Sequence, residues 1–310
     1  MAERPWRVLL YYLYVQIPEA EEYCARHREL CESLGLRGRI IVGSEGINGT
    51  VSGNWEATES YINTLKNDPL TSAVEFKIDE EPSGQHVFPK LSVKLRDEIV
   101  TLGLGSEDIN PNEVTGKHLS PTEWREALDD PNAVVIDARN DYEWKLGHFE
   151  GAILPDVPNF RDLPKWVREN REQLEGKRIL TYCTGGIRCE KFSGFLVREG
   201  FEDVSQLDGG IVTYGKDEKV KGDKYLGKCY VFDERIGVPV NRTDGALTIS
   251  KCAHCGESSD RYRNCAWKPC NDQFFCCEGC EEEWERCCCE ECLEKKRTKV
   301  REERASNVRD

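Results

Sequence analysis

Residues Arg178-Ile-Leu-Thr-Tyr-Cys183-Thr-Gly-Gly-Ile-Arg188 indicate the fold of the middle of this chain. The first of these residues form a continuous strand pattern that runs directly into Cys183, and a helical pattern follows from Cys189 to Glu199. A strand, a short glycine-containing loop and a helix in this order are typical of an open α/β sheet. Such sheets bind ligands at the carboxyl ends of their strands, so we expect Cys183 to lie at a functional site.

The loop after this strand has the composition of a thiolate site. Backbone N–H groups and the start of the helix are expected to converge on the sulfur of Cys183, which favours the nucleophilic thiolate. Gly185 and Gly186 allow the backbone to curl around the sulfur, and Arg188 adds a fixed positive charge. The alternative is an inert buried cysteine. We predict Cys183 and Arg188 as catalytic residues, and the supporting loop as Thr184, Gly185, Gly186 and Ile187.

Residues 117–225 continue the alternation of strands and helices around this loop. Ser120, Pro121 and Glu123 have the pattern of a helix start with a capping box. Residues 133–138 form a buried type of strand, and Asp137 and Arg139 stand at its end. We expect this pair to support the cysteine loop by hydrogen bonds, with maintenance of the fold as the alternative role.

Residues 1–116 show a different order of elements. Apolar and helical patterns predict a strand, a helix at 19–34, two strands around a glycine-rich turn, a helix at 54–66 and a further strand. This order predicts a ferredoxin-like α+β domain. The chain is therefore expected to combine this domain with a central α/β domain that has an open parallel sheet.

Residues 226–310 form a cysteine-rich segment with little aliphatic content, which needs metal to hold it together. Of the 16 cysteines, eleven fall between Cys252 and Cys292. Because the chain starts without a secretory signal pattern, the clustering indicates metal binding rather than disulfides. The thiols suffice for one or two structural zinc ions, with iron–sulfur ligation as an alternative. Cys276, Cys287 and Cys288 compete with the predicted ligands, which are Cys252, Cys255, Cys265, Cys270, Cys277, Cys280, Cys289 and Cys292.

Composition restricts the partners and the compartment. The 310 residues carry a net charge of −14, which argues against a protein coated with nucleic acid but permits a local basic groove. No apolar run approaches the length of a membrane span, and we expect a cytoplasmic protein without a membrane partner. The sequence has no dinucleotide-binding glycine motif and no histidine spacing of an iron site, so neither a flavin nor a nicotinamide site is expected.

Several motifs carry a resemblance to a known family. Residues 135–139, Glu143, residues 147–152, Tyr182-Cys183 and residues 207–211 resemble the signatures of rhodanese domains. The sequence of residues 183–191, together with residues 38–50 and 88–94, is typical of a smaller group within this family. It resembles the tRNA uridine-34 hydroxylase (TrhO) group of rhodanese-domain proteins, over most of residues 1–250.

This resemblance implies a function. Members of that group place a hydroxyl group on C5 of the wobble uridine of tRNA, with dioxygen as co-substrate, so the expected partner is the anticodon loop of a tRNA. Cys183 would be the essential residue. The N-terminal domain would serve as an RNA platform, with ordinary solvated surface charge as the alternative for its candidate contacts. These candidates are Arg39, Asn48, Lys90 and Lys94.

Two other functions compete with hydroxylation. The same loop could carry a persulfide on Cys183 and act as a sulfurtransferase, with thiosulfate or another persulfide as donor. Alternatively, the chain could be a non-catalytic, zinc-stabilised RNA-binding protein, although an activated thiol has no purpose in a scaffold. Cys189 could resolve an oxidised Cys183 or simply pack in the helix.

Overall fold

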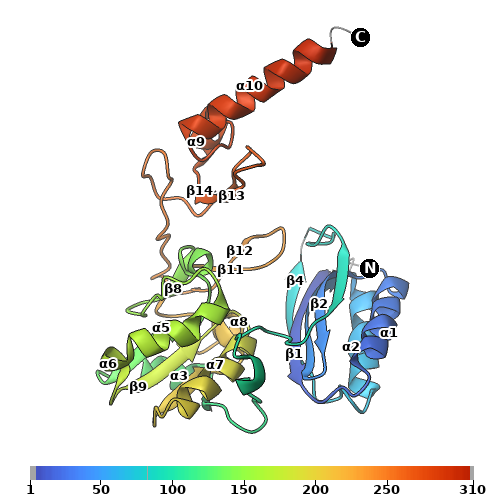
Figure 1. Cartoon of the computed structure of the whole chain (residues 1–310), viewed down its shortest axis with the longest axis vertical. Coiled ribbons are helices and arrows are strands. Elements are labelled where there is room, and N and C mark those ends of the chain that lie inside the picture. The colour runs from blue at the N-terminus through green and yellow to red at the C-terminus, as the bar shows by residue number, and fades with distance from the viewer. Residues whose placement is uncertain (1–4, 82, 308–310) are drawn as a thin grey trace.

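The computed structural model describes residues 5–81 and 83–307, which fold into three parts that follow one another along the chain (Figure 1). The first part is a five-stranded sheet in the order β4-β1-β3-β2-β5. Its antiparallel strands are β1 (Trp6–Tyr14), β2 (Arg37–Gly43), β3 (Gly46–Gly53) and β4 (Glu75–Glu81), and β5 (Leu91–Leu95) pairs in parallel with β2. The predicted ferredoxin-like layout is confirmed, with β5 as an added edge strand.

Two helices, α1 (Ala20–Ser33) and α2 (Trp55–Asn67), cover one face of this sheet. Alternation along β1 determines which residues meet them: Leu9 and Tyr11 belong to the buried core of this part. Leu10 and Tyr12 consequently point to the opposite face, which has no helix of its own. That face is directed at the second part of the molecule.

The second part is a parallel sheet in the order β6-β10-β9-β7. Its strands are β6 (Lys117–Leu119), β7 (Ala133–Asp137), β9 (Arg178–Tyr182) and β10 (Val204–Leu207). Apolar clusters lie on both faces, as expected for a parallel sheet, because Ile179 contributes to one cluster and Leu180 to the other. The surrounding helices are α3 (Pro121–Ala127), α4 (Asp141–Trp144), α5 (Leu163–Glu169), α6 (Arg171–Leu174), α7 (Ile187–Arg198) and α8 (Gly210–Lys216).

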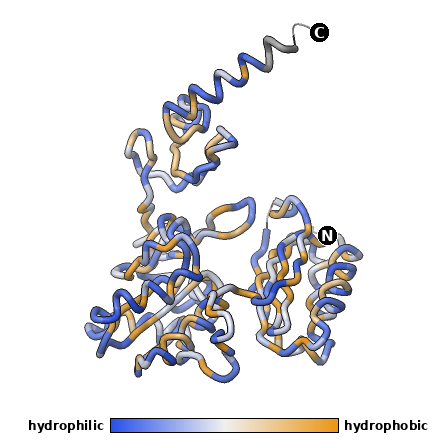
Figure 2. Tube along the Cα trace, viewed as in Figure 1, coloured by the Kyte–Doolittle hydropathy of each residue, from blue (hydrophilic) through white to orange (hydrophobic). Residues whose placement is uncertain are grey.

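The third part of the chain starts with a strand that pairs with the second part. Strand β11 (Tyr225–Tyr230) pairs with β8 (Gly147–Phe149) on one side and β12 (Gly237–Pro239) on the other. The chain then forms a small cysteine-rich module with β13 (Tyr262–Asn264), β14 (Gln273–Phe275) and α9 (Glu278–Glu283). A last helix, α10 (Glu290–Asn307), extends away from it and is largely hydrophilic (Figure 2).

Candidate active site

The cysteine loop connects β9 to α7, as its sequence predicts. Cys183 is fully buried, and the backbone N–H of Gly186 donates a hydrogen bond to its Sγ at 3.2 Å. Gly186 has a φ of 103°, a conformation that side chains other than glycine rarely adopt. The first turn of α7 follows immediately, so its free N–H groups point toward the sulfur.

This surrounding lowers the pKa of the Cys183 thiol to about 5. Burial opposes ionisation, but it is outweighed by the Cys189 thiol, the Arg188 guanidinium, and the backbone N–H groups of Cys189 and Arg188. The same burial, together with the neighbouring thiolate, raises the pKa of Cys189. Cys183 is therefore a thiolate at neutral pH, while its neighbour stays protonated and donates to it.

Arg188 is held by a carboxylate that the site prediction did not include. Its Nη1 and Nη2 lie 2.5 and 2.8 Å from Oε1 and Oε2 of Glu143, which α4 places opposite the loop. Nη2 also donates to Oγ1 of Thr184 at 3.2 Å. All three side chains are buried, so this bidentate pair fixes the loop and part of the arginine charge is neutralised. In the sequence, Glu143 was recognised only as part of a family motif, and its pairing with Arg188 was not predicted.

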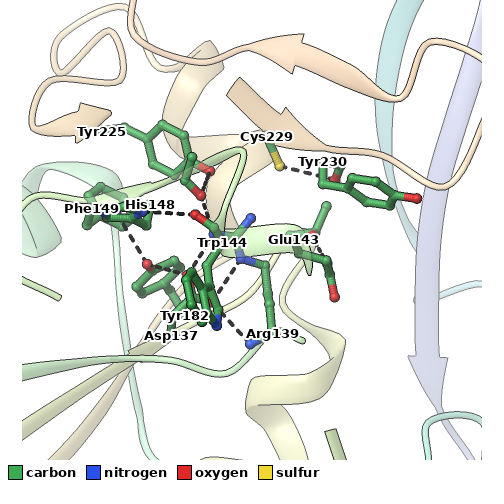
Figure 3. A network of polar contacts seen from close by, with 12 residues as sticks. Asp137, Arg139, Glu143, Trp144, His148, Phe149, Tyr182, Tyr225, Cys229 and Tyr230 are labelled. Atoms are coloured by element: carbon green, nitrogen blue, oxygen red, sulfur yellow. Dashed lines mark hydrogen bonds and ion pairs between the residues drawn. The ribbon is translucent and has the colours of Figure 1, made fainter. Parts of the chain in front are cut away.

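Asp137 and Arg139 form a second buried ion pair beside the loop (Figure 3). Arg139 donates to both carboxylate oxygens of Asp137 and to the carbonyl of Gly147, and Tyr182 donates to Asp137 at 2.6 Å. Within the described residues, their hydrogen bonds go to the strand end and to β8 rather than to residues 183–188. The pair thus holds the segment from which Cys183 emerges.

The open face of the N-terminal sheet packs directly on the cysteine loop. A Cβ atom on Gly185 would lie 2.8 Å from Cδ2 of Leu10, and one on Gly186 would lie 2.8 Å from the hydroxyl of Tyr12. The two glycines therefore serve a purpose besides wrapping the sulfur: they let the neighbouring domain approach. Sequence reasoning within the loop alone could not detect this contact.

Residues 190 and 191 of α7 fasten the two domains together. Glu190 accepts a hydrogen bond from the Tyr12 hydroxyl at 2.9 Å. The Lys191 ammonium is fully buried among three carboxylates, with Nζ 2.8 Å from Glu45 and 3.0 Å from Glu98. Asp108 is the third, at 2.5 Å. The sequence that follows Arg188 is thus suited to a chain with this N-terminal domain, because Glu190 and Lys191 both contact it.

A pocket of about 440 Å³ lies between the sheet face and the loop. Three arginines line it, namely Arg39, Arg161 and Arg188, and none of the described lining residues is acidic. Cys183 borders this pocket and has no exposed area toward bulk solvent. The remaining lining residues include Leu10, Tyr12, Ile41, Asn48, Thr50, Asn140, Phe160, Thr184, Gly185, Ile187 and Phe232.

The four predicted RNA contacts separate into two groups. Arg39 and Asn48 line the pocket. Lys90 and Lys94 are exposed and lie outside its lining, although Lys94 pairs with Ile41 in the register of β5 and β2 and shares its face of the sheet. Arg161 and Phe232 were missed, because they come from loops whose position only the folded chain defines.

The cysteine-rich module gathers eight thiols into two groups of four. Cys252 and Cys255 meet Cys277 and Cys280, while Cys265 and Cys270 meet Cys288 and Cys292, with the sulfurs of each group within 4.8 Å of one another. The first pair therefore joins the third and the second joins the fourth, so the two sites are interleaved. Each group has the donor set of a tetrahedral metal site.

One predicted ligand differs from the structure. Cys288, rather than Cys289, belongs to the second group, and Cys289 is exposed. Cys288 and Cys289 both lie in the turn before α10, which begins at Glu290, so the spacing in the sequence does not decide which of the two thiols lies beside Cys292. The Cys-x2-Cys pattern at 289 and 292 was therefore misleading.

The described part of the chain has no helix that combines the length and the apolar character needed to cross a bilayer.

Models of three protein families match successive parts of the chain. Residues 6–99 match the UPF0176 acylphosphatase-like domain, residues 120–217 the rhodanese-like domain and residues 226–293 the rhodanese C-terminal family. A solved rhodanese-like domain from Anabaena sp. has a TM-score of 0.31 at 23% identity, over 36% of this chain and 80% of that one.

Two curated relatives are similar over nearly the whole chain. Proteins from Shouchella clausii and Bacillus mycoides, both named tRNA uridine(34) hydroxylase, are each 56% identical over 289 residues. The alignments cover 93% of this chain and 89% of each relative. The chain therefore belongs to the tRNA uridine(34) hydroxylase family.

Proposed function

We propose that this protein is an oxygen-dependent enzyme that hydroxylates C5 of the wobble uridine, U34, in the anticodon loop of tRNA. One structural observation supports the proposal most strongly: a thiol with a pKa of about 5 borders a pocket lined by three arginines and by no carboxylate among the described residues. In a chain with a net charge of −14, Arg39 and Arg161, which make no ion pair with any described carboxylate, give this pocket a local positive charge that favours a polyanionic substrate.

In the proposed reaction the Cys183 thiolate forms an S–C bond to C6 of uracil, and the electron pair of the C5–C6 double bond moves onto C5 and O4. C5 then takes one oxygen atom from dioxygen and loses its proton, and the S–C6 bond breaks to restore the ring. The second oxygen atom leaves as water. Two molecules of a low-molecular-weight thiol supply the two electrons and two protons that this requires, and they are oxidised to one disulfide.

The loop's part in this chemistry is electrostatic. The backbone N–H groups and Arg188 favour the thiolate before attack and receive it again when it leaves. Because Arg188 is paired with Glu143, its position is fixed and no reorganisation is needed during the reaction. Asp137 and Arg139 do not contact Cys183 in this proposal. They hold the end of strand β9, from which Cys183 follows, through the hydrogen bond from Tyr182 to Asp137.

The open sheet face is the proposed RNA platform. Arg39 and Asn48 contact the nucleotide in the pocket, and Lys90 and Lys94 contact phosphates further along the same exposed edge. This division follows from position, because only the first two residues line the cavity.

The two cysteine groups are proposed to hold one structural zinc ion each. Four sulfurs at about 2.3 Å from a tetrahedral zinc lie about 3.8 Å apart. The separations Cys255–Cys277 and Cys270–Cys288 are both 3.7 Å, and Cys288–Cys292 is 3.8 Å. The thiols thus have the spacing that zinc requires. None of these eight cysteines lines the pocket beside Cys183, which favours a structural role for the metal.

The proposal is tested by mass spectrometry of nucleosides from unmodified tRNA incubated with the protein and a thiol reductant. We expect uridine to gain one oxygen in air, not under anaerobic conditions, and not with Cys183→Ala. Absence of this gain, combined with cyanide-releasable sulfur on Cys183 after thiosulfate treatment, would replace hydroxylation by sulfur transfer.

A further inference from the structure

The pocket beside Cys183 contains a side chain that can distinguish uracil from cytosine. We propose that it holds a single everted pyrimidine nucleotide and that the side-chain oxygen of Asn48 accepts a hydrogen bond from N3–H of uracil. This inference rests on the proposed function and assigns the residue that selects its substrate.

The size of the pocket fits one nucleotide. Its volume of about 440 Å³ lies in the range of roughly 300–1,000 Å³ that is usual for small-ligand sites. A base within a stacked strand could not reach Cys183, which is fully buried at the boundary of the pocket. Enzymes that perform chemistry on a base solve this problem by taking the base out of its stack.

The orientation of the Asn48 amide is determined by its partner. Nδ2 donates a hydrogen bond to the backbone carbonyl of Ile99 at 3.0 Å. A carbonyl can only accept, so the NH2 group must face Ile99 and the side-chain oxygen must face elsewhere. No hydrogen bond reaches this oxygen from any described residue, and Asn48 lines the pocket. The oxygen is therefore an available acceptor with a fixed direction.

An acceptor at this position discriminates between the two pyrimidines. N3 of uracil carries a hydrogen and donates, whereas N3 of cytosine has a lone pair and would face the Asn48 oxygen without a hydrogen bond. A site built to bond a donor rejects a ligand that lacks it, because the site's own polar group is left unpaired.

Other lining residues suit the rest of the nucleotide. Arg39 and Arg161 make no ion pair with any described carboxylate, unlike Arg188, so their charge is available to the phosphates on either side. Phe232 is 41% exposed, and its ring offers a surface on which a neighbouring base can stack.

Binding of anticodon stem-loop RNA to the full-length Cys183→Ala protein tests the inference without turnover. The RNAs carry uridine, cytidine or N3-methyluridine at position 34 and are otherwise identical. We expect the uridine RNA to bind about 10-fold more tightly than the other two. In Cys183→Ala/Asn48→Ala this preference should fall below about twofold.

Asn112 provides a matched control, because its Nδ2 also donates to a backbone carbonyl, that of Tyr14, outside this pocket. Asn112→Ala should keep the full preference. Equal binding of all three RNAs by the Cys183→Ala protein, or a preference that survives Asn48→Ala, would overturn the inference. The comparison with N3-methyluridine leaves the protein unchanged, so it decides even if Asn48→Ala fails to fold. A lack of hydroxylation by the wild type would count against the proposed function and would not alter this binding preference.

Discussion

Nζ of Lys191 lies 2.8 Å from Oε2 of Glu45, and this contact joins the helix after the cysteine loop to the β2–β3 turn of the N-terminal domain. Lys191 is fully buried and is shared with Glu98 and Asp108. The pocket exists only because the two domains are held in this arrangement. The ion cluster therefore belongs to the construction of the active site, although it does not touch the substrate.

Lys191→Met should destabilise the protein by about 3 kcal/mol, because it leaves three carboxylates close together without their cation. We expect a lower thermal midpoint and faster proteolysis between residues 96 and 116, which connect the domains. Lys295→Met is the control, since Lys295 forms an exposed pair with Glu291, and no measurable change is expected there. A Lys191→Met protein with the wild-type midpoint would show that the cluster does not fasten the domains.

Cys183 should react as a thiolate well below neutral pH. Its pKa of about 5 is below that of an ordinary thiol, so the thiolate fraction rises from pH 4 to 6 and is nearly complete above that. The rate of iodoacetamide labelling, followed on the Cys183 peptide by mass spectrometry, should follow this curve and reach a plateau by about pH 7. Cys31, whose pKa is raised to about 12 by burial, is the internal comparison and should stay unlabelled. A rate that still climbs between pH 7 and 9 would contradict the assignment.

Arg188 and its partner Glu143 should affect Cys183 in different ways. Arg188→Met removes the cation that favours the thiolate and leaves Glu143 buried and unpaired, so the midpoint of the labelling curve should move to higher pH and kcat/KM should fall by roughly 10²-fold. Glu143→Gln keeps the cation, so the midpoint should not rise, and its loss should appear in thermal stability. If both variants raised the labelling midpoint equally, the pair would act as one unit on Cys183.

The features of the site that could be predicted from the sequence are those formed by residues close together in the chain. Cys183, its glycines and Arg188 follow one another along the chain, so their chemistry could be recognised from spacing. Glu143 lies 45 residues from Arg188, and it pairs with it only after β7 and β9 align. The contact of Gly186 with Tyr12 is likewise a product of domain packing. Contacts between residues that lie far apart in the sequence could not be predicted from the motifs.

Arg39 and Arg161 should each contribute to the salt dependence of RNA binding. Neutralising one phosphate contact in single-stranded RNA changes the slope of log K against log salt by about 0.7. Arg39→Gln and Arg161→Gln should each reduce the slope by this amount, and Lys165→Gln, on the exposed side of α5, should not. Phe232→Ala should weaken binding without changing the slope, and Phe232→Tyr should restore it. An unchanged slope in both arginine variants would place the phosphates elsewhere.

The two neighbouring cysteines just before α10, Cys288 and Cys289, give the clearest test of the metal sites. Cys288 belongs to the second group of four thiols and Cys289 does not, although the Cys-x2-Cys spacing of residues 289 and 292 favours the latter. We expect two zinc ions per wild-type chain, one per Cys288→Ser chain and two per Cys289→Ser chain, measured by native mass spectrometry. Because the two sites are interleaved, loss of one ion should also expose the module to proteolysis while Cys183 keeps its labelling curve. Loss of zinc from Cys289→Ser with full retention in Cys288→Ser would reverse the ligand assignment.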